Sequence, residues 1–233
     1  MNAILTDGLR ALGLDPSRAP ILEKYGTLLL EGNRVTNLTA ITDPDEVARL
    51  HMLDCAAVAA CVPLAGKRVL DVGTGAGFPG LVLRAVEPSI RLTLMDSLGK
   101  RTDWLRETAP LLGGSPVTVI HGRAEEYGRE TDFRERFDIV TSRAVADLRM
   151  LAELCLPFAA VGGLFLAMKS GDCAAEKAQA AHAIAALGGT LREDRVYSIP
   201  GTAITRRIVV MEKTAPTPTQ YPRRFARIRK NPL

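Results

Sequence analysis

The 233-residue chain is poor in the residues that mark secreted, metal-binding and membrane proteins. It contains four cysteines, three histidines and one tryptophan. The cysteines form no C-x-x-C pair and have no clustered histidine partners, so we expect no metal site and no disulfide framework, but buried free thiols. No run of 18 apolar residues occurs, which excludes a transmembrane helix, and the start of the chain lacks the features of a signal peptide. We therefore expect a cytoplasmic protein with no membrane partner.

Positive charge is concentrated at the C-terminal end. The formal net charge is +4, and residues 221–233 alone contribute +5, so the preceding residues sum to −1. We predict that residues 214–233 form an extended basic tail that contacts a polyanion. A solvated, frayed terminus is the alternative explanation.

The remaining sequence divides into two parts. Residues 1–62 show helical spacing of apolar residues, which predicts a helical N-terminal extension. Residues 63–213 alternate strand and helix signals, which is typical of an α/β domain with a mostly parallel sheet. Strands are predicted at 68–72, 91–96, 117–121, 137–142 and 164–169, and helices at 79–86, 98–112, 147–159 and 172–187. The last two β-rich segments, 192–200 and 206–213, are separated by a short turn, so they predict a closing antiparallel hairpin.

A glycine-rich segment, VLDVGTGAGFPG at 69–80, follows the first predicted strand. Gly75, Gly77 and Gly80 form G-x-G-x-x-G, the fingerprint of a dinucleotide-binding turn. Asp71 and the glycines after it also form D-x-G-x-G-x-G, in which an acidic residue facing the ligand would suit a positively charged cofactor such as S-adenosylmethionine. A tight turn without a ligand is a third interpretation.

Asp96 ends the second predicted strand, 21 residues after Gly75. A carboxylate at this place can accept hydrogen bonds from both hydroxyls of an adenosine ribose, in either class of cofactor. The alternative is that Asp96 caps the helix that follows. The antiparallel end of the sheet is typical of class I S-adenosylmethionine-dependent methyltransferases, which have a Rossmann-like fold.

Seven stretches carry a more specific resemblance. They are NLTAITDPDE (37–46), HMLD (51–54), DVGTGAGFPG (71–80), DSLGKR (96–101), TSRAVADL (141–148), MKSG (168–171) and YPRR (221–224). Together they resemble the RsmG family, also called GidB or glucose-inhibited division protein B, over about residues 20–230. This resemblance implies transfer of a methyl group from S-adenosylmethionine to N7 of a guanine in 16S ribosomal RNA of the small subunit.

The resemblance also implies roles for individual residues. Gly73 and Phe78 would contact the cofactor, and Ala124 and Glu125 would lie beside its adenine. Gly75, from the glycine motif, and Asp96, from its place at the strand end, are further expected cofactor contacts. Arg143 would lie near both the cofactor and the target base, where a planar guanidinium can stack or bind an anion. We expect RNA phosphate contacts from basic residues at the ligand-binding edge of the sheet and in the tail: Lys100, Arg101, Lys169, Arg223 and Arg224. Two residues depart from the family pattern, Gly32 in place of a tryptophan and Ala226 in place of a glycine.

The segment after the fourth predicted strand bears on the reaction. Ser142-Arg143-Ala144-Val145 stands where enzymes that methylate exocyclic amines carry N/D-P-P-aromatic. RNA cytosine-C5 methyltransferases need a cysteine nucleophile to activate the ring. No cysteine occupies that place in this chain, although Cys155 on the next helix stays an alternative nucleophile. Guanine N7 already presents a lone pair and needs no proton removal.

We accordingly expect no general base, and we expect structural roles for His51, His121 and His182. Two other functions stay open at this point. One is an NAD- or FAD-dependent oxidoreductase, and the other is a non-enzymatic RNA- or cofactor-binding module.

Overall fold

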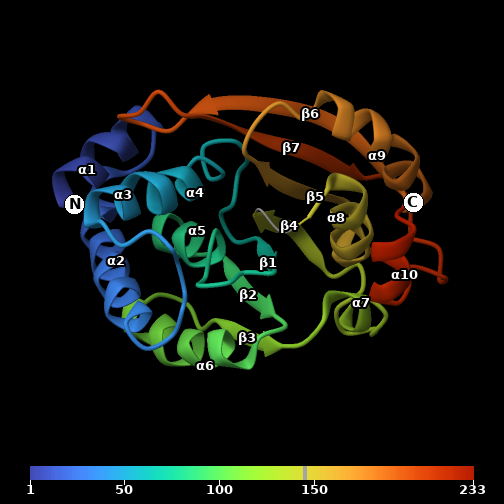
Figure 1. Ribbon diagram of the computed structural model, residues 1–233, viewed down its shortest axis with the longest axis horizontal. Coiled ribbons are helices and arrows are strands. Elements are labelled where there is room, and N and C mark those ends of the chain that lie inside the picture. Colours follow the sequence, from blue (N-terminus) through green and yellow to red (C-terminus); the bar gives the residue numbers. More distant parts are fainter. Residues whose placement is uncertain (144–145) are drawn as a thin grey trace.

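The computed structural model describes residues 1–143 and 146–233, and it contains a seven-stranded sheet in the order β3-β2-β1-β4-β5-β7-β6 (Figure 1). Strands β1 to β5 run parallel, whereas β7 runs antiparallel to both β5 and β6. The predicted mostly parallel sheet with an antiparallel end is therefore confirmed. The strands are β1 (Arg68–Val72), β2 (Arg91–Asp96), β3 (Thr118–His121), β4 (Phe137–Arg143), β5 (Ala159–Lys169), β6 (Gly189–Ser198) and β7 (Thr205–Lys213).

Side chains of the central strands alternate between two apolar cores. Val69 of β1 and Leu94 of β2 belong to the first core, while Leu70 of β1 and Met95 of β2 belong to the second. This alternation follows from the two-residue period of a strand. Because helices cover both faces of the sheet, the central strands are apolar on both sides (Figure 1).

The first core packs against the helices from the first half of the chain, and the second core packs against those from the second half. On the first face lie α1 (Asn2–Ala11), α2 (Ala19–Asn33), the π-helical turn η2 (Ala48–Leu53), α4 (Asp54–Ala56), α5 (Gly80–Val86), α6 (Gly99–Thr108) and η3 (Ala109–Leu112). On the second face lie α7 (Ala124–Tyr127), α8 (Leu148–Cys155), η4 (Leu156–Phe158), α9 (Ala174–Ala186) and α10 (Phe225–Lys230). The short elements η1 (Pro16–Arg18) and α3 (Pro44–Val47) complete the N-terminal region.

Two helix starts show how the sequence sets these boundaries. Asp43 accepts hydrogen bonds from the backbone N–H groups of Asp45 and Glu46 and caps α3, whose first residue is a proline. Asp147 caps α8, the helix that follows β4 in the chain, in the same way.

The N-terminal helices hold the glycine-rich loop after β1. The hydroxyl of Tyr25, a fully buried residue of α2, donates a hydrogen bond to the carbonyl of Ala76 in that loop. Further along α2, the indole of Trp104 occupies the space where a side chain at Gly32 would begin. The departure from the family pattern at Gly32 is thus matched by the only tryptophan of the chain, which packs against this helix from α6.

The C-terminal tail is folded onto the second face of the sheet. Arg223 forms an ion pair with Glu153 of α8, whose side chain is fully buried, and Ile228 of α10 is also fully buried. The expectation of an extended tail is therefore wrong for 225–230, because an apolar side chain on this short helix is buried in the second core. Ala226 lies exposed in the same helix. The division of the chain into domains stays a prediction.

Candidate active site

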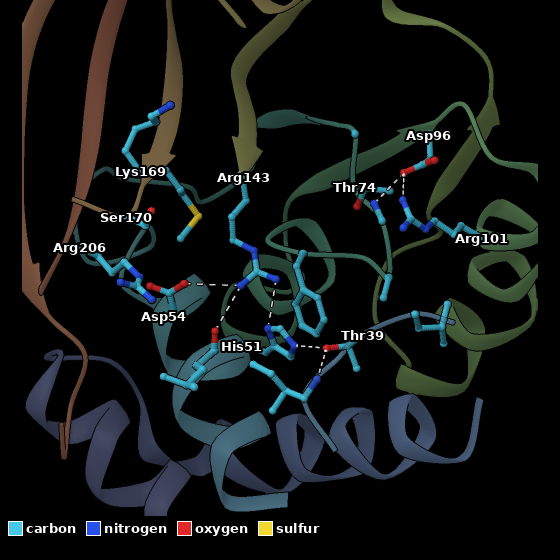
Figure 2. Close-up of a pocket in the computed structure, with 18 of the residues that line it drawn as sticks. Thr39, His51, Asp54, Thr74, Asp96, Arg101, Arg143, Lys169, Ser170 and Arg206 are labelled. Atoms are coloured by element: carbon cyan, nitrogen blue, oxygen red, sulfur yellow. Dashed lines mark hydrogen bonds and ion pairs between the residues drawn. The ribbon is translucent and has the colours of Figure 1, made fainter. Parts of the chain in front are cut away.

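A cavity of about 680 Å³ opens at the carboxyl ends of β1, β2, β4 and β5 (Figure 2). The segment between α2 and α3 and the turn η2 form its opposite wall, and β6 and β7 contribute one residue each. Of the residues predicted from the sequence, seven line this cavity: Gly73, Gly75, Phe78, Asp96, Arg101, Arg143 and Lys169. The parallel sheet thus gathers these side chains at the edge where open α/β sheets bind ligands.

The glycine-rich loop leaves room beside the cavity. Gly73 and Gly75 have φ angles of 68° and 59°, which lie in the left-handed region that favours glycine. A Cβ atom at Gly75 would meet no other atom within 4 Å, so this position borders open space. The loop therefore forms a shallow cradle into which a ligand can come close to the backbone.

Asp71, in contrast, does not line the cavity. It is fully buried beneath the loop and accepts hydrogen bonds from the Thr74 hydroxyl at 2.6 Å, the Gly80 N–H at 2.9 Å and the Thr141 hydroxyl at 3.2 Å. Burial raises its pKa to about 6, against the opposing effect of these hydrogen bonds. The expectation that Asp71 faces a cationic cofactor is wrong, because its carboxylate holds the loop to the start of α5.

Asp96 is directed into the cavity from the end of β2. One carboxylate oxygen accepts from the Gly75 N–H at 2.8 Å, and the other accepts from the Leu98 N–H at 2.9 Å. The Arg101 guanidinium lies 3.7 Å from the first oxygen. Because an ionised carboxylate has about four acceptor positions, each oxygen can accept one further hydrogen bond. Asp96 is therefore suited to bind the two hydroxyls of a ribose.

Arg143 lies at the centre of the cavity, between Asp54 and His51 (Figure 2). Its guanidinium lies over the ring of Phe78, 4.8 Å from the centroid, and donates to Leu50 O at 3.3 Å and His51 Nδ1 at 3.2 Å. The imidazole of His51 stacks on the same phenyl ring, with the centroids 4.6 Å apart. Cation–π contact and hydrogen bonds together fix the orientation of the guanidinium.

His51 is held in its neutral form. Burial and, to a lesser extent, the charge of Arg143 lower its pKa to about 4, and only the backbone hydrogen bond of Leu50 acts in the opposite direction. An arginine can only donate, so His51 Nδ1 accepts and the ring proton is on Nε2. The expectation of a purely structural role for this histidine is therefore incomplete, since it lines the cavity.

In the wall beyond Arg143, the carboxylate of Asp54 lies among the positive charges of Arg143 and Arg206. Asp54 accepts a hydrogen bond from the Tyr197 hydroxyl at 2.7 Å and lies 3.5 Å from Arg143 Nη1. Burial raises the pKa of Asp54, while Tyr197, Arg143 and Arg206 act to lower it. Arg206 of β7 completes this wall (Figure 2). The cavity is consequently more cationic on this side, away from Asp96.

The predicted RNA-binding residues occupy different environments. Lys169 lines the cavity, but its ammonium group donates to Ala146 O at 3.0 Å and to Glu176 Oε1 at 2.7 Å. Lys100 is exposed on the first turn of α6 and does not line the cavity. Arg224 is exposed in the tail, whereas Arg223 is bound to Glu153, so Arg223 anchors the tail.

Ala124 and Glu125 lie on α7 and not in the cavity lining. Glu125 accepts a hydrogen bond from Arg123 Nε at 2.9 Å and borders a separate hollow together with Arg224. Their predicted contact with an adenine stays a prediction. Within the segment Ser142-Arg143-Ala144-Val145, the last two residues lie outside the described part of the chain.

Sequence reasoning missed several lining residues that come from distant segments: Thr39, Asp54, Tyr197 and Arg206. Thr39 and Asp54 lie within two of the stretches that carry the family resemblance, so a signal for them was present. Tyr197 and Arg206 had none, because they reach the cavity only through the pairing of β7 with β5 and of β6 with β7.

All four thiols are free, as predicted, and Cys55, Cys155 and Cys173 are buried, but Cys61 is only half-buried. Cys155 is fully buried outside the cavity lining. Burial also raises the pKa of Cys155 well above its usual value, which argues against a nucleophilic role. Across residues 1–143 and 146–233, no three side chains are grouped to hold a metal ion. No helix in these ranges is long and apolar enough to span a membrane.

The sheet order, the glycine cradle and the strand-end carboxylate define a class I S-adenosylmethionine-dependent methyltransferase. A solved structure of a ribosomal protein L11 methylase from Lactobacillus delbrueckii subsp. bulgaricus has the same fold, with a TM-score of 0.53 and 14% identity over 71% of this chain and 79% of that one. Residues 18–199 match the family model of rRNA small subunit methyltransferase G.

Full-length relatives agree with this match. The ribosomal RNA small subunit methyltransferase G of Symbiobacterium thermophilum is 47% identical over 100% of this chain and 98% of its own length. That of Lachnoclostridium phytofermentans is 43% identical over 100% and 97%. The chain belongs to the rRNA small subunit methyltransferase G family. It is an S-adenosylmethionine-dependent enzyme that methylates small-subunit ribosomal RNA, which excludes the oxidoreductase and the non-enzymatic alternatives.

Proposed function

We propose that the enzyme transfers the methyl group to N7 of a guanine in 16S ribosomal RNA, with the small ribosomal subunit as its partner. The observation that supports this choice is the state of the acid–base groups in the cavity. The imidazole of His51 accepts from Arg143, which is always protonated, so its Nδ1 cannot take a proton from a substrate. Both lining carboxylates, Asp54 and Asp96, already accept hydrogen bonds from protein donors.

A substrate that needs no deprotonation fits such a site. Bound S-adenosylmethionine supplies an electrophilic methyl group on a sulfonium. Guanine N7 offers a lone pair at the base edge, whereas an exocyclic amine must lose a proton when it is methylated. The residues then have to align the base and stabilise the redistribution of charge, and the fixed guanidinium of Arg143 is suited to this task.

Cofactor and RNA are assigned to the two ends of the cavity in this proposal. Asp96 and the glycine cradle around Gly75 bind the nucleoside part of the cofactor. Arg206 and Lys169 face the RNA backbone at the cationic end. Arg101, beside Asp96, and its neighbour Lys100 add positive charge at the opposite rim. Arginine and lysine side chains are the usual partners of phosphate groups in RNA-binding proteins.

The test is to incubate radiolabelled S-adenosylmethionine with small subunits from a strain that lacks this activity, and in parallel with naked 16S RNA. Labelled nucleosides are then separated and identified. Label in N7-methylguanosine is the expected result, and label on an exocyclic amine or a ring carbon would refute the proposal. Comparison of the two substrates identifies which form of the RNA the enzyme uses.

A further inference from the structure

The hydrogen bonds from Arg143 through His51 to Thr39 have a defined direction (Figure 2). Arg143 Nη2 donates to His51 Nδ1, which leaves the ring proton on Nε2. This nitrogen lies 2.7 Å from the hydroxyl oxygen of Thr39 and therefore donates to it. The orientation of the last hydrogen bond is thus imposed by an arginine that cannot change its protonation state.

The hydroxyl oxygen of Thr39 receives a second hydrogen bond from the backbone N–H of Ile41, at 3.1 Å. A hydroxyl oxygen has two acceptor positions and one hydrogen, so both acceptor positions are filled. Among the residues that the structure describes, no acceptor for the remaining hydrogen is found. Because Thr39 lines the cavity, this hydrogen is available to a bound molecule.

We propose that Thr39 is a donor-only group that binds an acceptor oxygen of one of the two reactants. The two candidate acceptors are a carboxylate oxygen of the cofactor's methionine part and O6 of the target guanine. The second source rests on the proposed function, and the first does not. Groups that can only donate at this position, such as the ammonium of the cofactor or the N6 amine of adenine, are disfavoured by the same hydroxyl.

The decisive variants separate the hydroxyl from the shape of the side chain. Thr39→Val removes the donor and keeps the volume, whereas Thr39→Ser keeps the donor. Thr27→Val is the matched control, because Thr27 is exposed on α2 and does not line the cavity. Thermal unfolding of each variant establishes that the fold is retained.

In the first arm, calorimetry measures the dissociation constants of S-adenosylmethionine and of decarboxylated S-adenosylmethionine. If Thr39 binds the carboxylate, Thr39→Val weakens S-adenosylmethionine binding by about tenfold or more and leaves the decarboxylated cofactor unaffected. Thr39→Ser then restores most of the affinity.

In the second arm, single-turnover methyl transfer is measured at saturating cofactor on RNA that carries guanine or 2-aminopurine, which lacks O6, at the target position. If Thr39 binds O6, Thr39→Val slows transfer to guanine by about 2- to 12-fold and does not slow transfer to 2-aminopurine. The proposal is overturned if neither arm separates Thr39→Val from the native enzyme, if all ligands are affected equally, or if Thr39→Ser behaves like Thr39→Val. A native enzyme that binds cofactor but never methylates RNA would refute the proposed function. The first arm would still test Thr39, because it measures cofactor binding alone.

Discussion

At the scale of single residues, Asp96 carries the clearest consequence for cofactor binding. Each of its oxygens already accepts one backbone hydrogen bond and has room for another. A hydrogen bond to a charged acceptor contributes about 1.5 to 3 kcal/mol, so Asp96→Ala is expected to raise the dissociation constant of S-adenosylmethionine about 10- to 150-fold. Calorimetric titration measures this change. Asp103→Ala, an exposed acid on α6, is the control and should leave the constant unchanged.

His51 makes the stability of the enzyme depend on pH. Its pKa of about 4 in the folded protein lies below the unfolded value near 6.5, so the unfolded chain binds more protons between these values. The stabilisation is fully present above about pH 6.5 and is lost as the pH falls toward 4. Between pH 7 and pH 5 the loss is about 2 kcal/mol.

Urea unfolding at these two pH values, compared with His51→Gln, isolates this contribution. The native protein should lose about 2 kcal/mol more than the variant on going to pH 5. Equal losses in the two proteins would show that His51 does not titrate with the lowered pKa.

The two aspartates of the first βα units show what residue-level prediction can and cannot achieve. Asp96 was predicted correctly to lie at the ligand-binding edge, since the end of a parallel strand sets its place in the fold. Asp71 belongs to an equally suggestive motif, but its side chain points below the loop, where Thr74 and Gly80 bind it. The direction of a side chain at the start of a turn depends on contacts that the motif alone does not contain.

At the scale of elements, two glycines of the loop after β1 have different roles: Gly75 leaves room for a ligand, and Gly77 allows close packing within the fold. Gly75 borders open space, whereas a Cβ atom at Gly77 would lie 2.6 Å from the Tyr25 hydroxyl and 2.7 Å from a methyl carbon of Leu81. Both glycines have positive φ angles, so alanine at either position costs about 1 to 2 kcal/mol of backbone strain. Only Gly77→Ala adds a steric clash.

We therefore expect Gly77→Ala to destabilise the protein by roughly 1 to 3 kcal/mol more than Gly75→Ala does. Gly75→Ala should instead weaken cofactor binding, because its methyl group enters the cradle. Denaturant unfolding and calorimetry on both variants measure the two effects. A Gly75→Ala protein that is the less stable of the two, or that binds the cofactor normally, would contradict this expectation.

Element boundaries show where periodicity was sufficient. The central strands β1, β2 and β4 follow the predicted ranges closely because both of their faces are apolar. Strand β5 begins five residues earlier than predicted, at Ala159 instead of 164. Gly162 and Gly163 interrupt the apolar pattern of this strand, and its pairing with β4 contains a shift in register. Helix α10 was missed because a single buried apolar residue, Ile228, gives no periodic signal.

At the scale of the whole molecule, the basic tail combines an anchor with an exposed charged helix. Arg223 is bound to the buried carboxylate of Glu153, and Arg134 donates to the carbonyls of Thr217, Pro218 and Tyr221. Loss of Arg223 would leave a buried charge without its partner. Arg223→Ala is therefore expected to lower the free energy of unfolding by about 3 to 5 kcal/mol. Urea denaturation of this variant measures the loss, and a change below about 1 kcal/mol would contradict the anchoring role.

The exposed cations of the tail, in contrast, should act on RNA and not on stability. They are Arg224, Arg227, Arg229 and Lys230. Replacement of all four by glutamine retains the anchor at Arg223 and the buried Ile228. If each cation neutralises one phosphate of single-stranded RNA, the slope of log affinity against log salt concentration becomes shallower by about 2.8.

Filter binding of 16S RNA at several salt concentrations measures that slope, and urea unfolding should show little change. Two exposed cations of the N-terminal helices, Arg10 and Lys24, serve as the control, and their replacement by glutamine should leave the slope unaltered. An unchanged slope in the tail variant would assign the tail to folding alone, because the anchor explains its position without any RNA. A shallower slope with unchanged stability would separate the two functions within thirteen residues, 221–233: attachment to the fold at one end and attraction of the RNA backbone along the exposed helix.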